Sequence, residues 1–217
     1  MNNGNAPKTQ TTRPLPLTAC ATTLAAALVV SLPQFAHADR VAPPPVPENI
    51  QVDPGHKAFL KGFAVGTQNY ICLPSSLNPD VRAWTLFGPQ ATLFEDNDKQ
   101  IITHFLSPNP DESGTLRATW QHSRDTSAVW AMMIRTPALV PGAIPWLLLR
   151  VVGAEEGPTG GDKLTKTAFI QRLNTTGGVA PSEGCSIPSD VGKRAFVPYT
   201  ADYFFYKATD SNTDDED

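Results

Sequence analysis

The most unusual residue on physical grounds is an acidic side chain inside an aromatic segment. Asp202 lies in the run from Tyr199 to Tyr206, where most neighbours are aromatic. A carboxylate costs free energy to bury unless a partner neutralises it. Arg172, in a second segment of alternating residues, is the partner that we expect for Asp202. The plainer interpretation is an ion pair between neighbouring strands, or a charge on an edge strand.

A second interpretation gives the same two residues a binding role. Aromatic and apolar walls with a few convergent polar groups are typical of small-ligand sites, although ordinary β cores have them too. Arg172 and Asp202 would then form the polar floor of a pocket. The candidate ligand-binding residues are Tyr70, Trp146, Arg172, Tyr199, Asp202 and Tyr203.

The histidines raise the question of a metal site. Imidazole and carboxylate groups suit zinc or iron, so His104, His122 and Asp202 are the residues that could hold such an ion. No H-x-H or H-E-x-x-H spacing supports this, and His56 lies in a Pro-rich leader. We therefore expect structural or surface histidines, no metal site and no cofactor. The acidic turn at 95–98 does not match an EF-hand loop.

Hydrolytic chemistry is the alternative to binding. A serine hydrolase needs a nucleophile, a base and an orienting acid, but the chain has no G-x-S-x-G pattern. Ser127 is only a sequence neighbour of His122. A glycosidase needs two carboxylates across a cleft, and only Asp162 and Asp202 are candidates. The hydrolase that we keep as an alternative would use a strand-borne histidine with Asp202.

The N-terminal 38 residues have the features of a signal peptide. Lys8 and Arg13 form a positive region, a short apolar run covers 19–32, and Ala36-His37-Ala38 gives a small-x-small cleavage pattern. The apolar run is short for a membrane span, although a retained anchor is the alternative. We expect an exported protein, secreted or periplasmic, that begins at Asp39 and has no membrane span after cleavage.

Two cysteines remain after that cleavage, since Cys20 leaves with the signal. Cys72 and Cys185 in an exported chain predict one disulfide, and two buried free thiols are the alternative. The formal net charge of the full chain is -4 and no basic cluster stands out, so we expect no nucleic-acid partner.

Period-two alternation recurs along the rest of the chain and predicts strands. One covers 59–73, and 81–87 is a second that Gly88-Pro89 ends. The run 146–152 is apolar without a break, which favours a strand covered on both faces. Without any long helical period, the pattern predicts an all-β fold of eight to ten antiparallel strands, a sandwich or a barrel. We expect four parts: a signal at 1–38, a stiff Pro-rich leader at 39–55, one β domain at 56–208, and a disordered acidic tail at 209–217.

Several short runs resemble one family of exported proteins of unknown function, the 3455 family. They are Gln68 to Cys72, Trp84 with Gly88 to Ala91, Ile144 to Leu148, and the stretch Ile170 to Tyr206. The resemblance covers most of the chain beyond Gln51 and implies no activity. Our hypothesis is a non-catalytic module whose partner is an unknown small molecule or surface.

Overall fold

The computed structural model describes residues 41–209, and the expected signal peptide and most of the acidic tail lie outside this range. Regular structure in it consists of strands and three short 3-10 turns. The strands are β1 (His56–Pro74), β2 (Arg82–Phe94), β3 (Gln100–Asn109), β4 (Thr115–His122), β5 (Ala128–Met133), β6 (Ala138–Val140), β7 (Ala143–Glu155), β8 (Phe169–Gly177) and β9 (Arg194–Ala208). The turns are η1 (Glu48–Ile50), η2 (Pro110–Glu112) and η3 (Pro188–Asp190).

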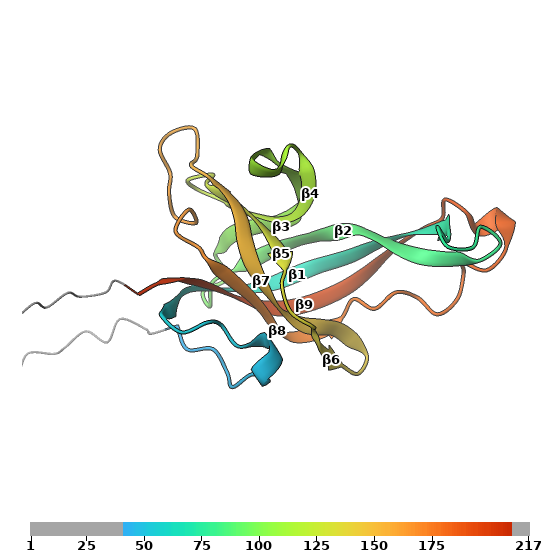
Figure 1. Cartoon of the computed structure of the whole chain (residues 1–217), viewed down its shortest axis with the longest axis horizontal. Coiled ribbons are helices and arrows are strands. Elements are labelled where there is room, and N and C mark those ends of the chain that lie inside the picture. The colour runs from blue at the N-terminus through green and yellow to red at the C-terminus, as the bar shows by residue number, and fades with distance from the viewer. Residues whose placement is uncertain (1–40, 210–217) are drawn as a thin grey trace, which may run out of the picture. The chain divides into compact units, whose positions relative to one another are not determined.

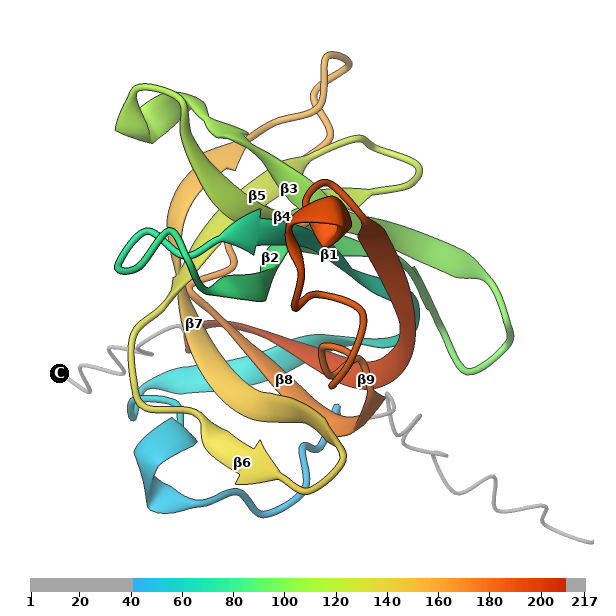
Figure 2. The ribbon, with the colours of Figure 1, turned by 90° about the vertical axis from the view of Figure 1, so that its right-hand side faces the viewer.

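The strands form one antiparallel sheet that closes on itself (Figures 1 and 2). Its order is β5-β4-β3-β2-β1-β9-β8-β7-β6, and an additional pairing of β5 with β7 joins the two ends. That pairing runs from Ala128 opposite Glu155 to Met133 opposite Leu149. The short β6 is left outside the ring as an extra strand on β7. The all-β prediction is confirmed, and the architecture is a closed eight-stranded barrel rather than a sandwich.

Alternation along β9 places one set of side chains inside the barrel. Tyr199, Ala201, Tyr203 and Phe205 are all buried in the interior cluster, as the period of two predicts. Leu164, from the segment between β7 and β8, is fully buried in the same cluster. It lies near the β4–β5 hairpin, because its N–H donates to Ser127 Oγ (3.1 Å).

The other face of β7, β8 and β9 is covered from outside by the leader. Ile50 is fully buried there against Leu148, Phe204 and neighbouring residues. Gln171 fixes the contact, since its Nε2 donates to the Ile50 carbonyl (2.7 Å) and its Oε1 accepts from the Tyr206 hydroxyl. The leader that we expected to be a stiff spacer therefore packs against the barrel. Val41, Val46 and Val52 of the leader pack against the same outer cluster.

A bulge in β2 replaces the break that Gly88-Pro89 predicted. The strand continues from Arg82 to Phe94, with a register shift opposite Asn69 and Tyr70. Gly88 has φ of +141°, and a Cβ there would lie 2.9 Å from the Leu106 side chain. Glycine at this position lets the strand bend without ending.

The predicted disulfide is confirmed. Cys72, near the end of β1, is bonded to Cys185 in the long segment between β8 and β9, with a Cα–Cα distance of 5.5 Å. The backbone bonds from Cys72 N–H to Lys193 O and from Gly192 N–H to Cys72 O reinforce the same junction. The bond thus ties the extended arm of β1 and β2 to the segment that leads into β9 (Figure 1).

Removing the disulfide should lower stability substantially. The bond closes a loop with a sequence separation of 113 residues, and disulfides typically contribute about 2–4 kcal/mol. We expect a double Cys72→Ala, Cys185→Ala variant to melt roughly 5–15 °C below the wild type. Thermal unfolding followed by circular dichroism tests this. An unchanged melting temperature would show that the bond constrains only the arm.

Shortening one leader side chain should show that the leader is part of the folded domain. Ile50 is fully buried, and Ile→Ala at such a site costs about 2–4 kcal/mol. Urea unfolding of Ile50→Ala measures the loss. Leu77→Ala is the matched control, because Leu77 is 96% exposed. Equal stability of the two variants would argue that the leader is only loosely attached.

Candidate functional site

The barrel contains a cavity of about 260 Å³ that is open to solvent on one side. Its lining includes Ala118, in the middle of β4, and Met133, at the opposite end of β5 from the Ser127 hairpin and Leu164. One end of the barrel is therefore filled by core side chains, and the other is hollow. The apolar part of the wall includes Leu86, Leu106, Ala118, Ala131, Leu147 and Leu149.

A buried histidine and a tryptophan form one polar section of the wall. The His104 ring stacks on Trp120 with centroids 4.1 Å apart and planes 11° apart. Burial lowers the pKa of His104 to about 3, even though its Nδ1 is hydrogen bonded to the Thr119 carbonyl (2.8 Å). The ring is therefore neutral at physiological pH. Because Nδ1 must donate to the carbonyl, Nε2 carries the lone pair.

Two buried donors in the wall lack a protein partner. Gln68 Nε2 and Trp120 Nε1 make no hydrogen bond to any group within residues 41–209. The side chains of Gln68 and Trp120 are only 2% and 1% exposed. An unsatisfied buried donor costs about 1–3 kcal/mol, so both groups call for an acceptor inside the cavity.

Arg172 brings a positive charge to the same cavity. Its Nε and Nη2 donate to the Pro145 carbonyl at 3.2 and 2.9 Å. Across the described part of the chain it takes part in no ion pair. In the register of β8 and β9 it lies opposite Tyr203, whereas Asp202 lies opposite Leu173. Arg172 and Asp202 therefore point to opposite sides of the barrel wall.

The expected pair of Asp202 with Arg172 does not form. Asp202 is on the outer face, where Lys61 Nζ is 3.5 Å from its Oδ1 and Asn174 Nδ2 donates to its Oδ2 (2.8 Å). A hydrolase site that combines His104 with Asp202 does not form either, because His104 lies inside the barrel and Asp202 lies outside it.

The six candidate ligand-binding residues thus divide between the two faces. Arg172 and Tyr203 line the cavity. Tyr70 and Tyr199 are buried nearby: the Tyr70 hydroxyl donates to the Gly178 carbonyl (2.6 Å), and the Tyr199 hydroxyl is 3.5 Å from that of Tyr203. Trp146 lies on the outer face of the barrel, as Asp202 does, and packs against the cluster that the leader covers.

Sequence reasoning did not single out Gln68 and Trp120, and it considered His104 only as a possible metal ligand. Gln68 alternates with Tyr70 and Cys72, so its place on the inner face could have been read from the pattern. His104 was expected to be structural or on the surface. Only the pairing of β3 with β4 brings His104 opposite Trp120.

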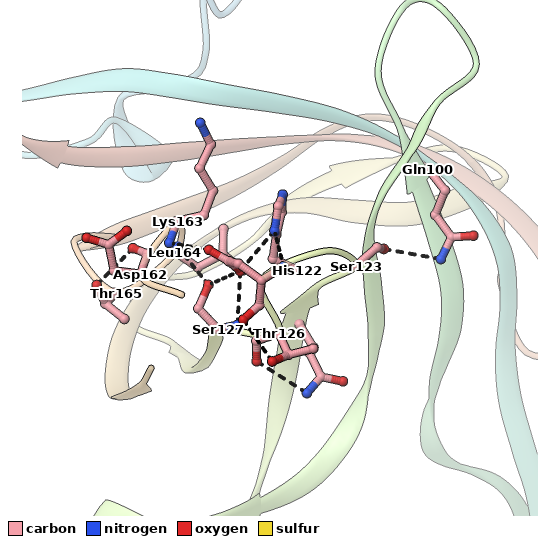
Figure 3. Close-up of polar contacts among 11 residues, drawn as sticks. Gln100, His122, Ser123, Thr126, Ser127, Asp162, Lys163, Leu164 and Thr165 are labelled. Atoms are coloured by element: carbon pink, nitrogen blue, oxygen red, sulfur yellow. Dashed lines mark hydrogen bonds and ion pairs between the residues drawn. The ribbon is translucent and has the colours of Figure 1, made fainter. Parts of the chain in front are cut away.

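The filled end of the barrel is held by a hydrogen-bond network around Asp125. Figure 3 shows its other members, His122, Ser127, Lys163 and Leu164. Asp125 Oδ1 lies 2.9 Å from His122 Nδ1 and accepts from Ser127 N–H (3.0 Å) and Oγ (2.8 Å). Its Oδ2 accepts from Lys163 N–H (2.7 Å), and Ser127 Oγ accepts from Leu164 N–H. The carboxylate lies between imidazole and hydroxyl, and Ser127 is fully buried. This is a structural clamp on Leu164, not a nucleophile activated by a base.

These features define a class of protein: a closed antiparallel β-barrel with an internal cavity that contains a cationic and several neutral donor groups. Residues 54–207 match the model of the family described as a protein of unknown function, DUF3455. The chain belongs to this family, as the resemblance of its sequence runs indicated. Comparisons with curated proteins and with solved structures gave no match.

None of the helical segments between residues 41 and 209 has the length and apolar character that a membrane crossing requires.

Replacing Asp125 should loosen the filled end of the barrel. Asp125→Ala removes the acceptor of several donors from Ser127 and Lys163, so we expect a loss of about 2–3 kcal/mol at pH 7. Asp96→Ala, at the exposed tip between β2 and β3, is the control and should change little.

The same variant should show a defined pH dependence. Burial alone would raise the pKa of Asp125, but the hydrogen bonds from Lys163 and Ser127 outweigh it and lower the pKa below its ordinary value of 3.8. The charged carboxylate therefore stabilises the fold above that value, and this contribution is lost as pH falls through the folded pKa. The stability gap between wild type and Asp125→Ala should narrow below about pH 4. A gap independent of pH would contradict the role of the charge.

Proposed function

We propose that this protein is a non-catalytic binding protein that holds a small, mostly apolar ligand in the cavity of its barrel. The observation that carries the proposal is the coincidence of a cavity inside the barrel with two buried donors that line it, on Gln68 and Trp120, and that have no partner within the described residues. Two further unpaired buried donors, Arg82 Nε and Trp146 Nε1, lie outside this cavity, so it is the position of Gln68 and Trp120 in its wall that supports a ligand.

The size and access of the cavity support a compact ligand. Its volume of about 260 Å³ is just below the usual range for small-molecule sites, which begins at about 300 Å³, and equals roughly nine water molecules. Leu86 and Met133 line the cavity and are about half exposed, at 51% and 49%. They therefore mark the mouth through which a ligand enters.

Larger hollows on the outer surface carry the proposal less well. One of about 430 Å³ involves Lys61, Phe63 and Val65 on the outer side of β1. Phe63 and Val65 are 43% and 48% exposed, so this hollow lies on the solvent-facing side of the strand. A surface partner could use it, but nothing in it is buried and unpaired as in the barrel.

An extracytoplasmic location, secreted or periplasmic, completes the proposal. The disulfide between Cys72 and Cys185 is consistent with an oxidising compartment. The signal-like features of residues 1–38 are the second support, and lie outside the described residues.

Filling the cavity should abolish binding without unfolding the barrel. Ala118 is part of the wall, and Ala118→Phe places a ring in the space that the ligand needs. With the neutral fluorophore 1-aminonaphthalene as probe, we expect a fluorescence increase in the wild type and at least about a tenfold weaker affinity in the variant, a loss of about 1.4 kcal/mol.

Leu139→Phe is the matched control, because Leu139 is 85% exposed in β6 and outside the cavity. Circular dichroism and the melting temperature confirm that each variant folds. Equal affinity of Ala118→Phe and the control would place the probe elsewhere, and absence of any binding by the wild type would count against the proposal.

A further inference from the structure

We infer that the ligand is a small monocarboxylic acid, whose carboxylate binds Arg172 inside the barrel while its apolar body occupies the rest of the cavity. This inference rests on the proposed function and names the chemical class of its ligand.

The positive charge of Arg172 has no acidic partner among the described residues. The Arg172 guanidinium is half-buried and lines the cavity, yet its only hydrogen-bond acceptor in the described chain is the neutral Pro145 carbonyl. Asp202, the acidic residue nearest in the paired strand, is on the outer face and has Lys61 and Asn174 as its own partners. An interior cation without a protein counter-ion is stabilised by an anion from outside.

The field of this charge extends through the interior. Burial raises the pKa of Tyr70 and of Tyr199, and the charge of Arg172 acts against that effect in both. At His104, burial lowers the pKa, and the charge of Arg172 lowers it further. The interior is therefore positive, and the neighbouring groups that could titrate near neutral pH do not offset it.

Besides the His104 Nε2 lone pair, the cavity wall presents unpaired hydrogen-bond donors. Trp120 Nε1 and Gln68 Nε2 need acceptor oxygens, as do the remaining N–H groups of Arg172. A carboxylate offers two oxygens in the plane and spacing that a guanidinium binds with paired hydrogen bonds. A hydroxyl oxygen could also accept from these donors, but it carries no charge to balance that of Arg172.

The rest of the cavity wall is largely apolar. Leucine and alanine side chains from β2, β3, β4, β5 and β7 supply six of its fourteen lining residues, and Pro89 and Met133 add to the apolar surface. Such a surface favours a hydrocarbon or aromatic body and disfavours a second charge. With about 260 Å³ available, the body is a short alkyl chain or one to two fused rings.

The test compares two molecules that differ in charge but hardly in shape, 2-naphthoate and 2-naphthamide. Isothermal titration calorimetry of the full mature chain at fixed salt and pH 7 should give at least about a tenfold tighter affinity for the acid, equal to 1.4 kcal/mol. In Arg172→Met this preference should disappear while naphthamide still binds. Lys61→Met, which removes a cation from the outer face, should keep the preference.

Each outcome has a definite meaning. Equal affinity of the wild type for both compounds overturns the carboxylate and leaves the proposed binding function standing. Binding of neither compound contradicts both. If Arg172→Met fails to fold, Arg172→Lys replaces it. Lysine keeps the charge but cannot form the paired hydrogen bonds. The ratio of the affinities for 2-naphthoate and 2-naphthamide should then be smaller than in the wild type but still above one. An undiminished preference in either Arg172 variant assigns the anion to another site.

Discussion

The pairing of β5 with β7 is the constraint on which the rest of the structure depends. It turns a long antiparallel sheet into a closed barrel. The side chains of His104, Trp120 and Arg172 then line a cavity in the barrel interior. On an open sheet the same residues would face water, where a lone guanidinium is fully solvated and an indole N–H has water as its acceptor. Closure removes most of that water. The electrostatic and hydrogen-bonding requirements of these groups then have to be met within the cavity.

Closure also explains why the outer face needs its own cover. In β7, Leu147 and Leu149 face the cavity, whereas Trp146 and Leu148 belong to the outer cluster under the leader. The outer face of β7 is thus covered by the leader, and its inner face lines the barrel interior. The leader stabilises the barrel from outside, and leaves the inner side free for a cavity. The Asp125 clamp fills only the opposite end, with Leu164.

The sequence predicted the fold well and the candidate site only in part. Alternation in Tyr199 to Tyr206 correctly separated Tyr203 from Asp202, since the first is inside and the second outside. The predicted ligand pocket nevertheless included both Tyr203 and Asp202. That prediction treated the aromatic segment as one site and ignored the two faces of its strand. Likewise, the apolar run at Trp146 predicted two covered faces, but it could not show which side chains face the cavity.

Other features depend on contacts that no local pattern contains. His104 meets Trp120 only through the register of β3 and β4, and the lack of a partner for Arg172 follows from the geometry of the whole ring. We expected the strand to end at Gly88, because glycine followed by proline usually ends a strand, but the structure has a bulge there. Here the glycine takes a positive φ against Leu106, and the strand goes on.

The central claim is that the barrel interior is an anion-binding cavity, and a crystal structure with 4-bromobenzoate tests it most directly. The anomalous signal of bromine locates the molecule without assumptions about its fit. The account predicts one bromine peak inside the barrel, among the leucines of the cavity wall, with the carboxylate in contact with the Arg172 guanidinium. Bromine peaks confined to the outer surface, with ordered water at Arg172, would contradict it.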